Sequence, residues 1–237
     1  MSILSDKAII SLSGGCDSAT CLGVAVDEYG PGNVIAVSFE YGQKHAKELE
    51  CADALCAYYN VEHVTIELGR CGIFDGADCS LLRDSDKAIP NGSYSEQINE
   101  NGVSTYVPFR NGLMLSCLAA KAVSIDSGAD WVIFLGAHSD DAAGNAYADC
   151  SRAFVDAISQ AIEIGTYGKV AVKAPFVEMN KADVVAAGLR LGVPYELTWS
   201  CYKGGERQCG RCGTCLDRIA AFESNGVLDP VPYDEVI

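Results

Sequence analysis

The fold is decided by residues 8–18, which read Ala8-Ile9-Ile10-Ser11-Leu12-Ser13-Gly14-Gly15-Cys16-Asp17-Ser18. A short apolar run ends in Ser-Gly-Gly, and a segment with apolar residues at helical spacing begins at once. This order predicts a buried strand, a tight turn and the start of a helix. Glycines let the backbone approach an anion closely, and the free N–H groups of a helix start attract phosphate. The stretch therefore predicts a phosphate-binding loop with Ser13 and Ser18 as hydroxyl donors; a plain turn with a capped helix is the alternative.

The rest of the chain continues the alternation of strands and helices. We expect strands at 8–12, 34–39, 61–68, 131–136 and 170–174, and helices at 16–29, 44–59, 111–126, 151–164 and 181–191. Such alternation predicts an α/β protein with a doubly wound parallel sheet. Residues 1–195 are expected to form this domain, and residues 196–237 a C-terminal segment packed on it.

Residues 70–103 interrupt the alternation, because they are rich in Asp, Gly, Ser and Asn and have no sustained period. A loop this long inside a compact domain is uncommon and often functional, for example as an active-site lid. A disordered insertion is the alternative that the sequence leaves open.

Charge and hydropathy exclude some partners. The formal net charge of −15 argues against nucleic acid as the main partner, although a local electropositive pocket could still bind ATP. No apolar run approaches the length of a membrane span, and the N-terminus lacks the basic-then-apolar order of a signal peptide. We therefore expect a cytoplasmic protein that does not bind membranes.

Twelve cysteines are present, and four of them cluster near the C-terminus as Cys201, Cys209, Cys212 and Cys215. Their C-x7-C-x2-C-x2-C spacing suits tetrahedral zinc with four thiolate ligands, so we predict a structural zinc site without an open position. Buried thiols, a disulfide and an iron–sulfur cluster are the alternatives. The cysteines at 16, 21, 51, 56, 71, 79, 117 and 150 are interpreted as small buried hydrophobic residues.

Polar side chains follow two expected strands, at residues 40–45 and 137–141. Ligands bind at the carboxyl ends of parallel strands, so His45 and His138 are expected at a binding edge, whereas His63 is expected to be structural. Arg110 is interpreted as a phosphate ligand, with a structural ion pair as the alternative. The carboxylates of Asp140, Asp141 and Asp149 suggest magnesium or the cationic face of a purine analogue, although Asp140 and Asp141 would also suit a solvated loop.

The motif at residues 13–18 resembles the pyrophosphate loop of N-type ATP pyrophosphatases. Five stretches together resemble one family, the 7-cyano-7-deazaguanine synthases. They are Ser-Gly-Gly-Cys-Asp-Ser at 13–18, Glu-Tyr-Gly-Gln-Lys-His at 40–45, Val-Pro-Phe-Arg-Asn at 107–111, Asp-Cys at 149–150 and Leu-Thr-Trp-Ser-Cys-Tyr at 197–202. The resemblance extends from the first strand to about residue 218, with the cysteine cluster close behind the last motif.

The resemblance implies an adenine-nucleotide alpha-hydrolase-like fold and a homodimer with one structural zinc ion per chain. It implies a ligase that uses ATP with Mg²⁺ twice on 7-carboxy-7-deazaguanine. Ammonia would first convert an acyl adenylate to the amide, and dehydration of the amide would then give 7-cyano-7-deazaguanine (preQ0), on the route to queuosine.

The resemblance also assigns roles to residues of this chain. The catalytic residues would be Asp17, Arg110, His45 and Asp149. ATP would be bound by Leu12, Ser13, Gly14, Gly15, Cys16, Asp17, Ser18 and Phe39. The substrate would be bound by Tyr41, Gln43, Lys44, Asn111, His138 and Asp141.

The chain departs from the family pattern at Glu40, Phe109 and Ala148, where the family has Asp, Gly and Pro. Two further functions therefore remain open. One is a related adenylating ligase that stops at the amide or acts on another substrate, including a tRNA-modifying pyrophosphatase. The other is a non-catalytic, zinc-stabilised nucleotide-binding protein.

Overall fold

The computed structural model describes residues 6–98, 102–143 and 146–234. Five parallel strands form one sheet in the order β3-β2-β1-β4-β5. Their bounds are β1 Lys7–Ser11, β2 Val34–Glu40, β3 Glu62–Glu67, β4 Trp131–Phe134 and β5 Val170–Lys173. The predicted α/β class with a doubly wound parallel sheet is confirmed, because the chain leaves β1 toward β2 on one side and reaches β4 on the other.

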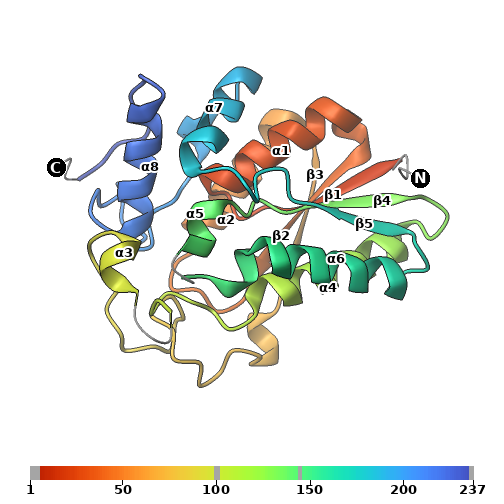
Figure 1. Cartoon of the computed structure of the whole chain (residues 1–237), viewed down its shortest axis with the longest axis horizontal. Helices are drawn as coiled ribbons and strands as arrows, with labels where there is room; N and C mark the ends of the chain where they lie inside the picture. The colour runs from red at the N-terminus through yellow and green to blue at the C-terminus, as the bar shows by residue number, and fades with distance from the viewer. Residues whose placement is uncertain (1–5, 99–101, 144–145, 235–237) are drawn as a thin grey trace.

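The helices cover both faces of this sheet (Figure 1). Their bounds are α1 Cys16–Tyr29, α2 Lys47–Tyr59, α3 Tyr94–Gln97, α4 Arg110–Ile125, α5 Ser139–Ala142, α6 Arg152–Gly165, α7 Lys181–Leu191 and α8 Gly213–Ser224. Short 3-10 helices occupy Pro31–Asn33, Gly69–Cys71, Ala148–Cys150 and Tyr195–Leu197. Among these segments, no helix is long and apolar enough to cross a membrane.

The two cores follow from the alternation of side chains along the strands. Ala8 and Ile10 of β1 point into a core with α1, α2, α7 and α8, whereas Ile9 points into a core with α4 and α6. All three side chains are fully buried, which explains the continuous apolar run at β1. A strand covered on both faces needs apolar residues at every position.

Three sequence expectations need correction. The helix α8 was not predicted, and Cys215 lies in its first turn rather than in a loop. The described part of residues 70–103 is packed on the domain rather than a disordered insertion, because Cys79 and Leu82 belong to the core with α4 and α6; residues 99–101 lie outside the described ranges. Cys71 is exposed rather than buried.

The remaining predicted cysteines behave mainly as small hydrophobic residues. Cys51 and Cys117 are half-buried, and the others are buried, namely Cys16, Cys21, Cys56, Cys79 and Cys150. His63 bridges Ser38 of β2 and Asp53 of α2 through its two ring nitrogens, at 2.7 and 2.6 Å. This bridge is the structural role that was expected for it.

The C-terminal segment is fastened by a buried arginine. Arg218 of α8 makes a bidentate ion pair with Asp229, at 2.6 and 2.9 Å. Its guanidinium also donates to Thr198, Ser200 and the carbonyl of Tyr195, and the side chain is fully buried. One cation therefore joins α8, the segment around Asp229 that follows this helix, and the segment after Tyr195–Leu197.

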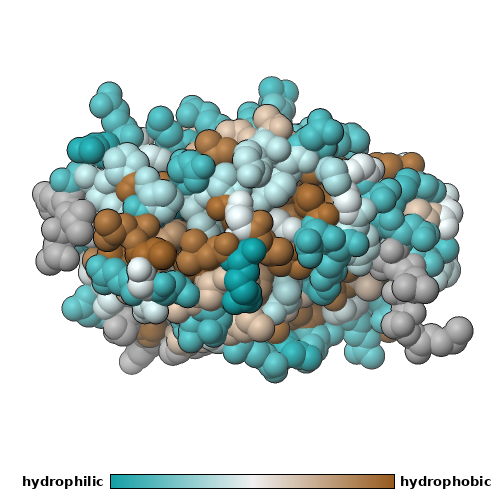
Figure 2. Space-filling view, turned by 90° about the horizontal axis from the view of Figure 1, so that it is seen from above, coloured by the Kyte–Doolittle hydropathy of each residue, from teal (hydrophilic) through white to brown (hydrophobic). Residues whose placement is uncertain are grey.

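Seen from above, where α1, α7 and α8 lie, apolar side chains form a band across the surface with polar side chains on both margins (Figure 2). Leu189 and Leu191 at the end of α7 are among the large apolar residues that remain exposed, at 40% and 37%.

We expect the replacement Arg218→Met to lower the free energy of unfolding by about 3–5 kcal/mol, because Asp229 would remain buried without a cation. Urea unfolding followed by circular dichroism measures this change. The control is Arg152→Met, whose side chain is exposed in its ion pair with Asp156 and which should leave the midpoint almost unchanged. Equal midpoints for Arg218→Met and the unmodified chain would contradict the prediction.

Candidate functional site

One pocket opens at the carboxyl ends of the strands, where β1 separates the two halves of the sheet. Apart from the four clustered cysteines, it brings together every site residue that the sequence predicted except Gly14 and Asp140. Those residues are Leu12, Ser13, Gly15, Cys16, Asp17, Ser18, Phe39, Tyr41, Gln43, Lys44, His45, Arg110, Asn111, His138, Asp141 and Asp149. Parallel strands place their carboxyl ends at one edge, so segments far apart in sequence converge there.

The loop after β1 is held by its own serines. Ser18 Oγ donates to the carbonyl of Gly15 at 3.1 Å and lies 3.0 Å from Ser13 Oγ. Gly15 is the residue before the first turn of α1, and no side chain caps this helix start. The first N–H groups of α1 therefore face the pocket and favour an anion.

Gly14 is required for a different reason from the one expected. A Cβ atom here would lie 2.0 Å from the carbonyl oxygen of Glu48, and the φ of Gly14 is +85°. The glycine thus allows α2 to rest directly on the loop, whereas Gly15 is the glycine that lines the pocket.

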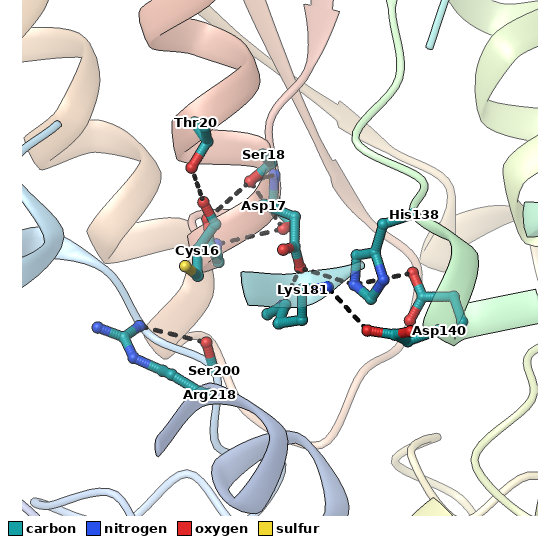
Figure 3. Close-up of polar contacts among 12 residues, drawn as sticks. Cys16, Asp17, Ser18, Thr20, His138, Asp140, Lys181, Ser200 and Arg218 are labelled. Carbon is teal, nitrogen blue, oxygen red and sulfur yellow. Dashed lines mark hydrogen bonds and ion pairs between the residues drawn. The ribbon is translucent and has the colours of Figure 1, made fainter. Parts of the chain in front are cut away.

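Three ionisable side chains meet at the start of α1 (Figure 3). The amine of Lys181, the first residue of α7, donates to Asp17 Oδ2. His138 Nε2 lies 3.7 Å from the same oxygen and 3.4 Å from Asp141 Oδ2. Asp17 Oδ1 is buried and has no hydrogen-bond partner within the described ranges.

The charges of this group decide its protonation. Burial alone would raise the pKa of Asp17, but Lys181 and His138 hold it well below its ordinary value. Burial lowers the pKa of His138, and the carboxylates of Asp17 and Asp141 outweigh this effect and raise it. Burial raises the pKa of Asp141. The group therefore offers one ionised carboxylate next to two potential cations.

Arg110 enters the pocket from the start of α4. Its Nη1 donates to the Tyr41 hydroxyl at 2.9 Å, and its guanidinium lies over the Tyr41 ring at 5.4 Å. No carboxylate lies within 4.0 Å of the Arg110 guanidinium in the part of the chain that the structure describes. The structural ion pair considered from the sequence is therefore not formed. Arg110 lines the pocket, and its guanidinium makes no hydrogen bond other than that to Tyr41 among the described residues.

Asp149 and Asp140 also bind the starts of helices. Asp149 Oδ2 accepts from the backbone N–H of Asn111 at 2.9 Å, and Asn111 Nδ2 donates to Cys150 Sγ at 3.2 Å. Asp140 Oδ2 accepts from the backbone N–H of Lys181 at 2.7 Å. Asp140 does not line the pocket, whereas Asp149 and Cys150 do.

The segment after β2 is held largely by its own contacts. The amide of Gln43 accepts from the N–H of Tyr41 and donates to the carbonyl of Phe39, at 2.8 and 3.2 Å. Lys44 Nζ donates to the carbonyl of Lys87 at 2.7 Å. His45 contacts Gly204 near the cysteine cluster, and its Nδ1 is buried without a partner among the residues described. The polar groups of Gln43 are therefore already bonded to the chain.

Sequence reasoning missed a group of tyrosines on the pocket wall. Tyr94 of α3, Tyr147 and Tyr202 join through their hydroxyls, with Tyr202 2.8 Å from Tyr94 and 3.4 Å from Tyr147. The long segment that includes residue 94 thus reaches the pocket. Nothing in the local sequence distinguishes these tyrosines from ordinary core residues.

Three charged residues that line the pocket were also missed, namely Lys181, Glu48 and Asp217. A lysine at the first position of a helix opposes the helix dipole, and this was the available signal for Lys181. Glu48 follows the polar segment 40–45 on the next helix, but an acidic residue in a first turn is ordinary. The sequence position of Glu48 therefore does not mark it as a residue of the functional site.

The four clustered cysteines come together at the start of α8. Their sulfur atoms lie within 4.8 Å of one another and all four residues are buried. Two of the sulfur–sulfur distances are 3.4 Å (Cys212 to Cys215) and 4.0 Å (Cys209 to Cys215). Tetrahedral zinc with bonds of about 2.3 Å requires separations of about 3.8 Å. The backbone N–H groups of Lys203 and Cys209 point at Cys201 Sγ, and the geometry of the four sulfur atoms suggests a metal site.

A parallel sheet with a glycine-rich loop at its switch point, a helix start free for an anion and a nearby lysine defines a nucleotide-binding α/β protein. Residues 7–226 match the family model described as queuosine biosynthesis protein QueC. The chain belongs to this family.

Curated relatives agree over nearly the whole chain. The 7-cyano-7-deazaguanine synthase of Caldicellulosiruptor bescii is 41% identical over 229 residues, which cover 96% of this chain and 97% of that protein. The 7-cyano-7-deazaguanine synthase of Archaeoglobus fulgidus is 44% identical over 230 residues, covering 97% and 91%. Among solved structures, the NH3-dependent NAD synthetase from Campylobacter jejuni is 18% identical with a TM-score of 0.48, and the alignment covers 83% of this chain and 68% of that one.

We expect Asp17→Asn to lower the pKa of His138, because the Asp17 carboxylate contributes most of the effect that raises it. The chain has three histidines, so NMR titration of the imidazole C–H signals resolves each ring. Asp156→Asn, an exposed change on α6, is the control and should leave all three titrations in place. An unchanged His138 pKa in Asp17→Asn would contradict the assigned geometry.

Proposed function

We propose that this chain is a 7-cyano-7-deazaguanine synthase, which converts 7-carboxy-7-deazaguanine and ammonia to the nitrile with two molecules of ATP. The observation that carries the proposal is the convergence of the predicted nucleotide and substrate residues on one pocket. Membership of the family supports the same reaction.

The first step activates a carboxylate, which is a poor electrophile because its leaving group would be oxide. Transfer to the α-phosphate of ATP gives an acyl adenylate, whose leaving group is AMP. The start of α1 and the amine of Lys181 are placed to stabilise the departing pyrophosphate. Arg110, with donors free toward the pocket, would bind a phosphate or the substrate carboxylate.

Magnesium fits the site at Asp17. Its Oδ1 is buried and has no protein partner among the described residues, and its low pKa keeps it ionised. Asp17 would hold the ion and Asp141 lies near it across His138. When bound, magnesium would neutralise part of the negative charge on the phosphates of ATP.

The second ATP would activate the amide oxygen in the same pocket. Phe109, the largest departure from the family pattern, does not line this pocket. Its ring packs on Phe154 of α6, 5.8 Å between ring centres, and over Gly112, so it leaves room for the amide to bind again. This orientation favours the nitrile over an enzyme that stops at the amide.

We expect two molecules of AMP for each nitrile when the protein is incubated with excess ATP, ammonium and 7-carboxy-7-deazaguanine. Both oxygens of the carboxylate must leave carbon as activated esters, which sets this ratio. Mass spectrometry of the product together with AMP quantification measures it.

Other outcomes identify the other functions. One AMP per molecule of accumulating amide would indicate a ligase that stops at the amide, and ATP binding without AMP would indicate a nucleotide-binding protein. The Asp17→Asn variant should keep its fold and lose turnover; normal turnover would contradict the assignment of the phosphate loop.

We also propose that the cysteine cluster holds one zinc ion per chain. The four buried sulfurs offer no fifth donor and no open position among the residues described, so the ion would shape the fold rather than take part in the reaction. Cys201 precedes the pocket tyrosine Tyr202, and Cys212 immediately precedes α8. The metal would thus position one wall of the pocket.

Metal analysis of the purified protein should give one zinc ion per chain, and Cys212→Ala should lose the metal and melt at a lower temperature, because metal binding contributes to folding. Cys71→Ala is the control, since Cys71 is exposed and outside the cluster. A metal-free protein that melts like the zinc-loaded one would contradict the proposal, and bound iron would point to an iron–sulfur cluster instead.

A homodimer belongs to the same proposal, with a second copy covering the apolar band on the side of α7 (Figure 2). Exposed Leu189 and Leu191 are consistent with such a contact. Light scattering on the purified chain tests it, and a monomeric mass at micromolar concentration would contradict it.

A further inference from the structure

Glu48, the second residue of α2, brings a carboxylate into the pocket that the mechanism above does not use. Its backbone is fixed against the phosphate loop, because its carbonyl oxygen occupies the space next to Gly14. Within the described part of the chain, no donor forms a hydrogen bond or ion pair with the Glu48 carboxylate.

The groups that act electrostatically on Glu48 come from three places. Arg110 faces it from the start of α4, Tyr41 from the end of β2, and Cys51 from the next turn of α2. The other acidic, basic and imidazole groups of the pocket are Asp17, Lys44, His45, His138, Asp141, Asp149, Lys181 and Asp217, and its other thiols and phenols are Cys16, Cys150, Tyr94, Tyr106, Tyr147 and Tyr202. Burial raises the pKa of Glu48 to about 7, against the lowering effect of Arg110.

The proposed reaction requires a base for the protons of the reacting nitrogen, and this inference rests on the proposed function. Ammonia that ends as the nitrile nitrogen loses three protons, one when the amide forms and two when the amide is dehydrated. Each proton leaves a nitrogen attached to the reacting carbon. A general base suited to this transfer has a pKa near the operating pH and no strong partner of its own.

Three of the other pocket carboxylates described here are engaged. Asp17 is paired with Lys181, Asp149 accepts from the N–H of Asn111, and Asp141 lies against His138. Asp217 also lines the pocket, but the charges that act on it are those of Lys181, His138, Asp140 and Asp141. Glu48 is the carboxylate that has no hydrogen-bond or ion-pair partner among the described residues and that feels the charge of Arg110. Its neighbour Arg110 is also placed to orient the acyl adenylate.

We propose that Glu48 is the general base that removes protons from the attacking nitrogen. In amide formation, the nitrogen lone pair forms the C–N bond, one N–H proton passes to the Glu48 carboxylate, and the C–O bond breaks with its electron pair on AMP. In dehydration, the amide oxygen bonds to the α-phosphate of the second ATP as pyrophosphate leaves. Glu48 then takes the remaining N–H protons in turn, after releasing each to water, and the C–O bond breaks to give the nitrile and AMP.

The test separates adenylation from the reaction of nitrogen. Glu48→Gln should retain ATP–pyrophosphate exchange dependent on 7-carboxy-7-deazaguanine, because forming the acyl adenylate requires no proton from nitrogen. Amide formation should fall by about 10²- to 10⁴-fold. With the concentration of free ammonia held constant, the unmodified enzyme should form amide faster as pH rises through about 7, and Glu48→Gln should lose this dependence.

Two further variants make the result specific. Glu48→Asp keeps a carboxylate and should retain the pH dependence at a reduced rate. Glu50→Gln is the matched control, because Glu50 lies on the same helix, is exposed and does not line the pocket; it should change neither activity nor pH dependence.

Retention of the pH dependence in Glu48→Gln, or equal loss of exchange and amide formation in a folded variant, would overturn the role of Glu48. Failure of the unmodified protein to form either amide or nitrile would instead overturn the proposed function. Melting curves of the variants establish that each is folded, so the two failures are distinguishable.

Discussion

The structure depends on the constraint that the chain leaves the carboxyl end of β1 in one direction and returns beside β1 from the other. No crossover helix can cover the space above that strand end, so a crevice forms there. The crevice is lined by the loop at residues 13–18, the ends of β2 and β4, and the start of α4. A site that needs groups from many parts of the sequence therefore arises from strand order.

The C-terminal segment closes this crevice through a chain of backbone and side-chain contacts. The N–H of Trp199 donates to the carbonyl of Gly14, which ties the segment to the phosphate loop. Arg218 donates hydrogen bonds to Thr198 and Ser200, the two residues that flank Trp199. The cysteine cluster follows immediately, so its geometry and that of the phosphate loop are mechanically connected. A metal ion bound by these cysteines would thus influence the pocket by fixing one wall.

The sequence predicted the sheet well because the signals were local. The bounds of α1 and α7 agree with the predicted ranges, since a glycine turn precedes one helix and Asn180 and Gly192 cap the other. Helix α8 was not predicted, because its first turn contains Cys215 and so overlaps the cysteine spacing that indicates a metal site. The tyrosines of the pocket wall could not be identified, because their meeting depends on tertiary contacts between segments 55 and 108 residues apart.

Phe109 illustrates how a local departure can be harmless to a site. Its backbone is left-handed, with a φ of 52°, a conformation that glycine adopts without strain and phenylalanine does not. The left-handed backbone therefore explains the glycine of the family pattern at this position, and no requirement for space next to the substrate is needed. In this chain the backbone of Phe109 is strained, whereas its ring contacts Phe154, lies over Gly112 and does not line the pocket. The cost of the substitution falls on folding stability, and the residues that flank it, Val107 and Arg110, still face the pocket.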